Sequence, residues 1–238
     1  MKITVVTPTY NEAENLPKLV TALLSLPLPE LSFLVVDDNS PDGTGQLAEE
    51  FKRAYPGRVD VLHRPGKLGL GTAYIQGFQY LLGQGMDAIV QMDADFSHPP
   101  EKIVEMAEML PVCDVVVGSR YVPGGSVDVR WPVWRKMLSG WGNLYARTIL
   151  GLPMRDVTGG FRMWKTAVLK AMPLERIRSN GYVFQVETGY VANKLGFRFR
   201  EIPIYFAERR LGKSKMSLRI QLEAAVRVWQ LRGMYKDL

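Results

Sequence analysis

Cysteine is almost absent from this 238-residue chain, which contains a single one, Cys113. One thiol cannot form a disulfide within the chain, so we expect Cys113 to be a small buried side chain in a reducing compartment. The chain also lacks any run of about 18 or more uncharged apolar residues, so the sequence predicts no segment that spans a bilayer. Because the start, Met1 to Thr4, leads straight into a strand pattern, we expect no signal peptide.

Internal repeats, low-complexity tracts and linkers are missing as well, which favours one domain over residues 1–238. Hydrophobic residues make up 47% and charged residues 23%, as in an ordinary globular protein. The formal net charge of +6 suits an anionic partner. A nucleotide, a phosphorylated lipid, a nucleic acid and an anionic membrane surface all satisfy that condition, and the charge alone does not choose among them.

Short apolar runs alternate with amphipathic helical patterns along the first half of the chain. The runs predict strands at Ile3 to Thr7, Leu31 to Val36, Val59 to Leu62, Ala88 to Met92 and Val115 to Gly118. Strands that alternate with helices predict an α/β fold, a mostly parallel sheet with helices on both faces. We expect Asn11 to cap the helix that follows the first strand.

Beyond Arg120 the alternation breaks. The pattern predicts helices from Pro132 to Leu150, Tyr182 to Leu195 and Met216 to Met234, and a strand from Phe197 to Phe206 whose Pro203 indicates an edge or a bulge. The first and last of these helices combine apolar bulk with Lys or Arg, which is typical of helices that lie at a membrane interface. A core-packing helix with a basic, solvated face remains the alternative.

Two acids follow the apolar run from Ala88 to Val90. Asp93 and Asp95 are separated by one residue, and Pro99 and Pro100 then stop the strand. In an extended chain residues i and i+2 point the same way, so the two carboxylates share one side. A divalent cation relieves their repulsion, and Mg²⁺ typically completes its shell with water and substrate phosphates. The alternative is a solvated, Asp-rich turn.

Three further polar clusters follow predicted strands: Pro8 to Glu12, Asp37-Asp38 and Ser119-Arg120. Ligands of parallel sheets bind outside the carboxyl ends of the strands, so these clusters and the two acids indicate one site. Asp37 or Asp38 could accept hydrogen bonds from a base or ribose, and Tyr10 offers a ring face and a hydroxyl. The other interpretation is that Asp38 and Ser40 simply build a turn.

The segment from Gly66 to Thr72 is superficially similar to a phosphate-binding loop. It lacks the full G-x-x-x-x-G-K-[ST] order, so we do not predict an NTPase. A tight turn with close helix packing explains the glycines equally well. Taken singly, each loop or helix-end cation is better explained as a solvated charge. Together with a metal site at the paired acids, these cations indicate a cavity for polyanions: Arg120, Arg135, Arg209, Lys213 and Lys215.

These segments resemble known sugar transferases. Pro8-Thr9-Tyr10-Asn11-Glu12, Val36 to Thr44, Leu68 to Ala73 and Met92 to Asp95 resemble family 2 glycosyltransferases, which have the GT-A (Rossmann-like) fold. Gly118 to Tyr121, Asp156 to Arg162, Gly181 to Glu187 and Gly212 to Lys215 resemble the dolichyl (polyprenyl) phosphate mannose synthase branch. The resemblance extends from Ile3 to about Arg232. It implies a nucleotide-sugar half, residues 1–120, and an acceptor half with interfacial helices, residues 121–238.

The resemblance also implies roles for individual residues. The nucleoside of GDP-mannose would contact Pro8, Tyr10, Glu12, Val36 and Asp38. Asp93, Ala94 and Asp95 would lie at the diphosphate, with Asp93 and Asp95 holding Mg²⁺ or Mn²⁺. Arg120, Arg209 and Lys215 would bind phosphates of the donor or the acceptor, helped at the acceptor by Arg135 or Lys136, and Asp93, Asp95 and Arg120 would be catalytic.

Two departures from the family pattern affect these expectations. Some relatives carry a Gln ligand two positions after the second acid, where this chain has Ser97, so water or His98 would have to substitute. Some relatives also have carboxy-terminal transmembrane helices that this chain lacks. We therefore expect a peripheral protein on the cytoplasmic face of a membrane, which reaches its lipid through surface binding or a membrane-embedded partner subunit.

The implied reaction is transfer of mannose from GDP-mannose to a polyprenyl (dolichyl) monophosphate. An acceptor phosphate is ionised at neutral pH and can attack the anomeric carbon without a strong general base, which predicts inversion to a β-mannosyl phosphate. Another nucleotide sugar, such as UDP-glucose, is the alternative donor. A non-catalytic nucleic-acid-binding protein would also explain the basic charge, but it would not require acids clustered at strand ends.

Overall fold

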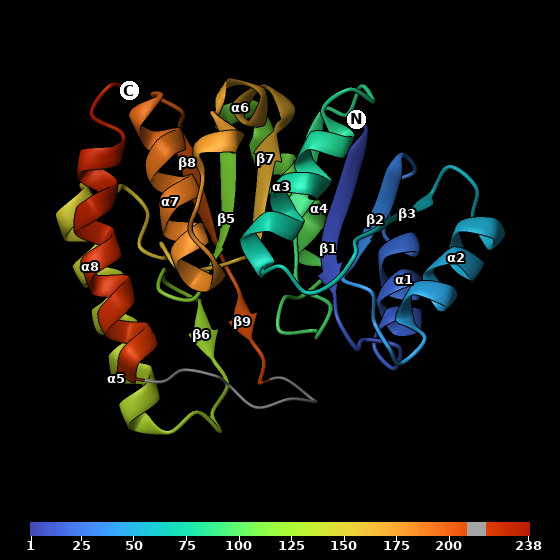
Figure 1. Ribbon diagram of the computed structural model, residues 1–238, viewed down its shortest axis with the longest axis horizontal. Coiled ribbons are helices and arrows are strands. Elements are labelled where there is room, and N and C mark those ends of the chain that lie inside the picture. The colour runs from blue at the N-terminus through green and yellow to red at the C-terminus, as the bar shows by residue number, and fades with distance from the viewer. Residues whose placement is uncertain (209–217) are drawn as a thin grey trace.

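A seven-stranded sheet forms the centre of the molecule (Figure 1). The computed structural model describes residues 1–208 and 218–238, with the backbone alone for residues 218–224. The strand order is β3-β2-β1-β4-β7-β5-β8, in which β7 is antiparallel to both neighbours and the other pairs are parallel. The strands are β1 (Ile3–Thr9), β2 (Leu31–Asp37), β3 (Val59–His63), β4 (Ala88–Gln91), β5 (Val115–Ser119), β7 (Arg162–Lys165) and β8 (Phe199–Pro203).

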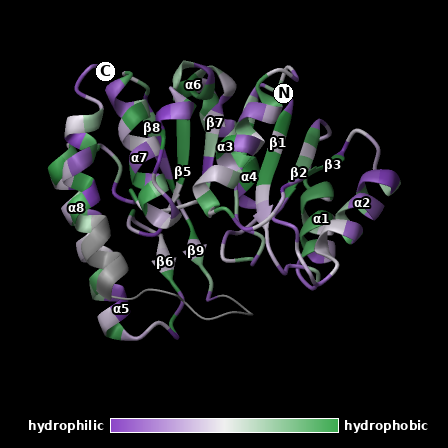
Figure 2. Ribbon diagram, viewed as in Figure 1, coloured by the Kyte–Doolittle hydropathy of each residue, from purple (hydrophilic) through white to green (hydrophobic). Residues whose placement is uncertain are grey.

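Helices cover both faces of this sheet because its strands bury apolar side chains on both sides. Along β1, Val5 packs with α1 (Leu16–Leu24), α2 (Thr44–Ala54) and α4 (Lys102–Met109), whereas Val6 packs into the core of the opposite face. That face is covered by α3 (Leu70–Leu81), α5 (Val133–Leu150), α6 (Thr166–Ala171), α7 (Gly181–Lys194) and α8 (Leu218–Met234). Figure 2 shows the resulting apolar strands between helices of mixed polarity. The predicted α/β architecture is therefore confirmed.

The predicted strand from Phe197 to Phe206 is interrupted. β8 ends at Pro203, and a separate strand β9 (Tyr205–Phe206) pairs with β6 (Ser126–Val127) in a small parallel sheet. Proline has no backbone donor, and Ile204 between the two strands bonds to both sheets: its N–H donates to Ser119 O (3.0 Å) and its carbonyl accepts from Ser126 N (2.9 Å). The edge position inferred from Pro203 is confirmed, since β8 is the last strand in the described sheet order.

The expectation that Asn11 caps the first helix is wrong. The N-cap position belongs to Asn15, and Asn11 has φ 62°, in the left-handed region. Asn11 turns the chain after β1 instead, and its N–H donates to Ser40 Oγ (3.1 Å). A turn closed by Asn15 N and Glu12 O (3.0 Å) then precedes the helix, which moves the helix start four residues along.

Close packing explains two glycines at the start of α3. A Cβ atom on Gly71 would lie 2.5 Å from Ser179 O and 2.9 Å from the Phe184 ring. Gly69 has φ +107°, and a Cβ there would lie 2.6 Å from Asn180 Oδ1. The structure therefore favours the packing interpretation for Gly69 and Gly71, whereas a Cβ on Gly66 would meet no atom within 4 Å. It also brings α3 and the segment before α7, which are distant in the sequence, into direct contact.

Two short 3₁₀ turns, Leu110–Val112 and Leu174–Arg176, complete the described secondary structure. None of the α-helices in the described ranges combines the length and the apolar character that crossing a membrane requires.

Candidate active site

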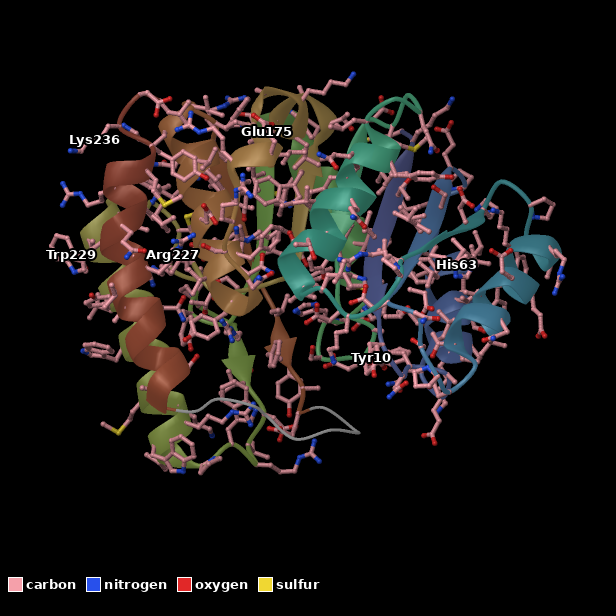
Figure 3. All side chains as sticks on the ribbon, viewed as in Figure 1. Tyr10, His63, Glu175, Arg227, Trp229 and Lys236 are labelled. Atoms are coloured by element: carbon pink, nitrogen blue, oxygen red, sulfur yellow. The ribbon has the colours of Figure 1, made fainter. Side chains whose placement is uncertain are left out.

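The polar clusters predicted from the strand ends meet at one edge of the sheet. β1 and β2 are paired up to Thr9 and Asp37, and β4 lies on the other side of β1, paired up to Val6 and Gln91. The loops that follow these strands therefore open on the same edge, the lower one in Figure 1, where Figure 3 labels Tyr10. We call this edge the rim.

Asp37 ties the first two rim loops together. Its carboxylate is buried and accepts hydrogen bonds from Thr9 Oγ1 (3.0 Å), Ser40 N (3.1 Å) and Ser40 Oγ (2.6 Å). The turn that sequence reasoning assigned to Asp38 and Ser40 is therefore built by Asp37 and Ser40. These three hydrogen bonds give Asp37 a structural role, so the expectation of an acid at a base or ribose now rests on Asp38.

Asp38 is held by Arg64, a residue that the sequence analysis missed. Arg64 Nη1 forms an ion pair with Asp38 Oδ1, and both side chains are less than 10% exposed. Arg64 Nη2 donates to Thr72 Oγ1 (2.6 Å), so one guanidinium links the β2 loop to the start of α3. Burial raises the pKa of Asp38 above its ordinary value, although Arg64 opposes the shift. The position of Arg64 directly after the predicted third strand could have revealed it.

The remaining residues expected at the nucleoside are arranged around the β1 loop. Tyr10 is 37% exposed, and Lys67 Nζ lies 4.0 Å from the centre of its ring, a cation–π contact that was not foreseen. Pro8 is half-buried, and Glu12 accepts from Asn15 Nδ2 (2.8 Å). Val36 is fully buried in the core beneath α3, so a ligand could reach its backbone but not its side chain.

The two acids lie beyond the end of β4 rather than on it. Because the strand stops at Gln91, Asp93 and Asp95 lie in the loop that follows it, where strand alternation does not orient them. In this loop Phe96 has φ 59°, in the left-handed region. Each acid is held separately. Asp93 Oδ1 accepts from Tyr74 OH (2.9 Å), and Asp95 Oδ1 accepts from Ser97 N (3.0 Å). Burial and the charge of Asp93 raise the pKa of Tyr74 well above its ordinary value, which keeps its hydroxyl a donor.

The donor set at these acids suits a hard divalent cation. Asp93 is half-buried and Asp95 is 8% exposed, with the buried Ala94 between them. Ser97 Oγ is buried without a hydrogen-bond partner among the described residues, which leaves a further oxygen beside Asp95. No group of three His, Cys, Asp or Glu side chains suited to a metal occurs in the described ranges. Two carboxylates completed by water and phosphate are the arrangement that Mg²⁺ commonly adopts.

His98 fits the role of substitute ligand poorly. Its Nδ1 accepts a hydrogen bond from the backbone N–H of Asp93 (3.1 Å), which places the ring proton on Nε2. Its ring also stacks on Phe161, with centroids 5.2 Å apart. A ring nitrogen that carries a proton has no lone pair for a metal, so water is the better candidate for the position that Gln holds in some relatives.

Arg120 at the end of β5 is held in a buried ion pair. Its Nε and Nη2 donate to the two oxygens of Asp156 (both 2.7 Å), and Nη2 also donates to Thr158 Oγ1 (2.8 Å). Asn143 Oδ1 on α5 accepts from the backbone N–H groups of Val157 (2.9 Å) and Thr158 (3.1 Å), which fixes this turn. The structure places Arg120 at the rim, as expected, but gives it a partner that the sequence did not reveal.

The structure describes only some of the basic residues expected at the acceptor phosphate. Arg135 Nη1 donates to both oxygens of Glu208 (3.0 and 2.9 Å), and its guanidinium lies 3.7 Å from the centre of the Trp131 ring. Lys136 Nζ lies 3.5 Å from Val129 O. Arg209, Lys213 and Lys215 lie outside the described residues. Arg135 is therefore anchored by Glu208 and Trp131.

A mostly parallel sheet flanked by helices on both faces is the GT-A architecture, which solved structures of the same fold share. Residues 4–173 match the family model of glycosyl transferase family 2. The chain belongs to this family, and the resemblance seen in the sequence is confirmed.

Two curated relatives match almost the whole chain. An undecaprenyl-phosphate mannosyltransferase from Micrococcus luteus is 47% identical over 240 residues, which covers 100% of this chain and 98% of the relative. A polyprenol monophosphomannose synthase from Mycolicibacterium smegmatis is 45% identical over 232 residues, covering 96% of this chain and 87% of the relative.

Solved structures share the fold at lower identity. Glucosyl-3-phosphoglycerate synthase from Mycobacterium tuberculosis, in complex with Mn²⁺, UDP and glucosyl-3-phosphoglycerate, has a TM-score of 0.63 at 15% identity, covering 98% of this chain and 79% of that chain. A mannosyltransferase from Pyrobaculum calidifontis in complex with GDP-Man and Mn²⁺ has a TM-score of 0.60 at 17% identity, covering 90% of this chain and 58% of that chain.

Proposed function

We propose that this protein transfers mannose from GDP-mannose to a polyprenyl monophosphate and forms a polyprenyl β-mannosyl phosphate. The observation that carries the proposal is the 47% identity, over the whole chain, to an undecaprenyl-phosphate mannosyltransferase. The rim agrees with it, because paired acids and cations at a sheet's carboxyl edge suit a nucleotide diphosphate and a phosphate acceptor. GDP as the nucleotide is supported by the mannosyltransferase of the same fold that was crystallised with GDP-Man.

Each group of rim residues has a part in this reaction. Tyr10 and Asp38 bind the nucleoside, helped by Pro8, Glu12 and the backbone of Val36. Asp93 and Asp95 hold Mg²⁺ or Mn²⁺, which when bound neutralises charge on the departing diphosphate. The phosphate-binding cations are Arg120, Arg135, Arg209 and Lys215. Residues 1–120 supply the nucleotide-sugar half, and residues 121–238 supply the acceptor half.

The chemistry needs little further machinery from the protein. A phosphate oxygen of the acceptor attacks the anomeric carbon and forms the new C–O bond. The bond from that carbon to the diphosphate oxygen breaks, and GDP leaves with the electron pair. The acceptor oxygen is already deprotonated, so no side chain has to remove a proton, and the task of the rim is to orient both phosphates.

Incubation of the protein with GDP-mannose, a polyprenyl phosphate and Mn²⁺ tests this proposal. We expect a mannosyl phosphate whose anomeric signals in NMR show the β configuration. UDP-glucose in parallel reactions tests the alternative donor. An α-linked product would contradict direct displacement. Turnover with UDP-glucose but not with GDP-mannose would contradict the assignment of the donor.

An exposed apolar stripe on α5 supports binding to a membrane surface, where such an acceptor resides. The stripe consists of Val133, Trp134, Met137, Trp141 and Leu144, each between 59% and 71% exposed. Their spacing puts them on one side of the helix, opposite the buried Asn143, Ala146 and Leu150. Trp229 on the neighbouring helix α8 also extends outward on this side of the molecule (Figure 3). Exposed Trp and Met side chains along one face are typical of an interfacial helix.

We expect the full chain to float with liposomes that contain anionic lipid and polyprenyl phosphate. Replacing both Trp134 and Trp141 by alanine should reduce the bound fraction at least about tenfold, since each buries a large apolar surface in the lipid. Tyr55→Ala is the matched control, because Tyr55 is an exposed aromatic residue on the opposite flank, at the end of α2. If the double variant and the parent float equally, the stripe does not contact the membrane.

A further inference from the structure

Tyr74 on α3 makes a buried contact with one of the two rim acids. Its hydroxyl donates to Asp93 Oδ1 (2.9 Å), and the residue has 0% exposure. The ring stacks on Phe184 of α7 (centroids 5.9 Å apart, planes at 5°) and on Phe78 of the same helix (6.0 Å, 28°). The hydroxyl of Tyr74 is thus the polar end of an otherwise aromatic contact, and it lies against the candidate site.

Two glycines on the same helix fix the position of this tyrosine. Gly71 lies one turn before it and Gly77 one turn after it. A Cβ on Gly71 would lie 2.5 Å from Ser179 O, and a Cβ on Gly77 would lie 2.7 Å from Val6 Cγ1. The backbone of α3 is therefore packed closely against β1 on one side and against the start of α7 on the other. Because the helix has no room to shift, the Tyr74 hydroxyl is held at a defined place.

Packing alone does not explain the hydroxyl. A phenylalanine would stack equally well against Phe78 and Phe184, and a buried hydroxyl without a partner costs about 1–3 kcal/mol. The hydrogen bond to Asp93 offsets that cost and restrains the carboxylate. Asp93 Oδ2 makes no hydrogen bond within the described ranges, so the contact occupies one carboxylate oxygen and leaves the other available.

We propose that Tyr74 is a positioning residue for the nucleotide-sugar donor: its hydroxyl holds Asp93 Oδ1 so that Oδ2 serves the cation at the diphosphate. The proposal rests on the proposed function, because it needs a cation at Asp93 and Asp95. Residues that orient a metal ligand commonly change metal affinity by about 10- to 100-fold when their hydrogen bond is removed. A purely structural tyrosine would change stability instead and leave metal affinity as it was.

The same helix supplies a matched control. Tyr80 OH donates to Asp60 Oδ2 (2.6 Å), which is also a bond from a tyrosine of α3 to an aspartate, but it lies at the other end of the helix, away from the rim. Tyr74→Phe and Tyr80→Phe each remove one such bond and no carbon atom. Asp93→Asn adds a third variant that keeps an oxygen for Tyr74 but removes the charge that a cation would bind.

The test uses the full chain and measures Mn²⁺ affinity in the presence of GDP, by the electron paramagnetic resonance signal of free Mn²⁺. We expect Tyr74→Phe to weaken Mn²⁺ binding about tenfold and to raise KM for GDP-mannose more than it lowers kcat, while Tyr80→Phe matches the parent. In the Asp93→Asn background, adding Tyr74→Phe should change Mn²⁺ affinity little further. Thermal melting of each variant checks folding independently.

The outcomes separate this inference from the function on which it rests. If Tyr74→Phe binds Mn²⁺ as tightly as the parent while Asp93→Asn binds it weakly, Tyr74 is structural and the inference alone is overturned. Weaker Mn²⁺ binding by Tyr74→Phe that persists unchanged in the Asp93→Asn background would also overturn it, because the effect would not pass through Asp93. If the parent itself binds no Mn²⁺ with GDP, the inference and the proposed function fail together.

Discussion

Replacement of Asp95 by asparagine is expected to lower kcat for mannose transfer by about a thousandfold. Asp95 Oδ1 accepts the backbone N–H of Ser97 (3.0 Å), and the residue is only 8% exposed. Asparagine keeps an oxygen for that hydrogen bond, so the turn is preserved while the charge that holds a cation is lost. Steady-state kinetics over a range of Mn²⁺ concentrations would measure the effect, and excess Mn²⁺ should restore only part of the rate.

Asp42 offers a control with the same local geometry. Its Oδ1 accepts the backbone N–H of Thr44 (3.1 Å), again two residues further along, but it lies in the turn before α2 rather than after β4. Asp42→Asn should therefore keep transfer within about twofold of the parent. If Asp95→Asn kept the activity of the parent, the charge of Asp95 would not be needed for transfer, and the residue would serve only to form the turn.

Local patterns were sufficient to predict the architecture. The β-branched and apolar runs gave the position of each strand in the first half, because a strand buried on both faces has few alternatives in sequence. The rim followed from those strands, since the carboxyl ends of parallel strands must share an edge. The wrong predictions concern ends of elements: Asn11 as a helix cap, Met92 as the end of a strand that stops at Gln91, and one continuous strand from Phe197 to Phe206. At Asn11 a single backbone dihedral, its positive φ, decides the course of the chain.

The contacts within the site could not be predicted in the same way. Arg64 reaches Asp38 across 26 residues, and Arg120 reaches Asp156 across 36. Tyr74 occupies a position in a helical pattern where any large apolar residue would satisfy the core, so nothing local distinguishes it from Phe78. These pairings depend on which strands are neighbours. The antiparallel insertion of β7 between β4 and β5, which brings Asp156 near Arg120, has no signature in the sequence.

Asp156→Ala is expected to destabilise the protein by about 3–5 kcal/mol, because it leaves Arg120 charged and unpaired in the interior. The side chains of Arg120 and Asp156 are 8% and 0% exposed, and Asp156 also accepts the backbone N–H of Arg120 (3.0 Å). Urea unfolding at neutral pH would measure the loss. Asp237→Ala is the control: Asp237 pairs with both terminal nitrogens, Nη1 and Nη2, of Arg176, but at an exposed site, where solvent screens the charges and the loss of stability should be far smaller.

The pH dependence follows from the same pair. Burial alone would raise the pKa of Asp156, but Arg120 and its hydrogen bonds hold that pKa below its ordinary value. A carboxyl group whose pKa is lowered by folding contributes its full stability above the ordinary value of about 4, and loses it as the pH falls towards the folded-state value. The difference in stability between the parent and Asp156→Ala should therefore be constant from about pH 6 to 8 and shrink in acid. A difference that grew on acidification would contradict an ionised Asp156.

Removing both partners separates the structural role of the pair from the proposed role of Arg120. In the double variant Arg120→Leu with Asp156→Leu no buried charge is left unpaired, so about half or more of the lost stability should return. Transfer should nevertheless stay at least about a hundredfold below the parent if the Arg120 guanidinium contacts a phosphate. A stable double variant with parental activity would show that Arg120 shapes the rim but takes no part in the reaction. An equally unstable double variant would show that the ion pair is not what holds the β5 end to the turn after α5.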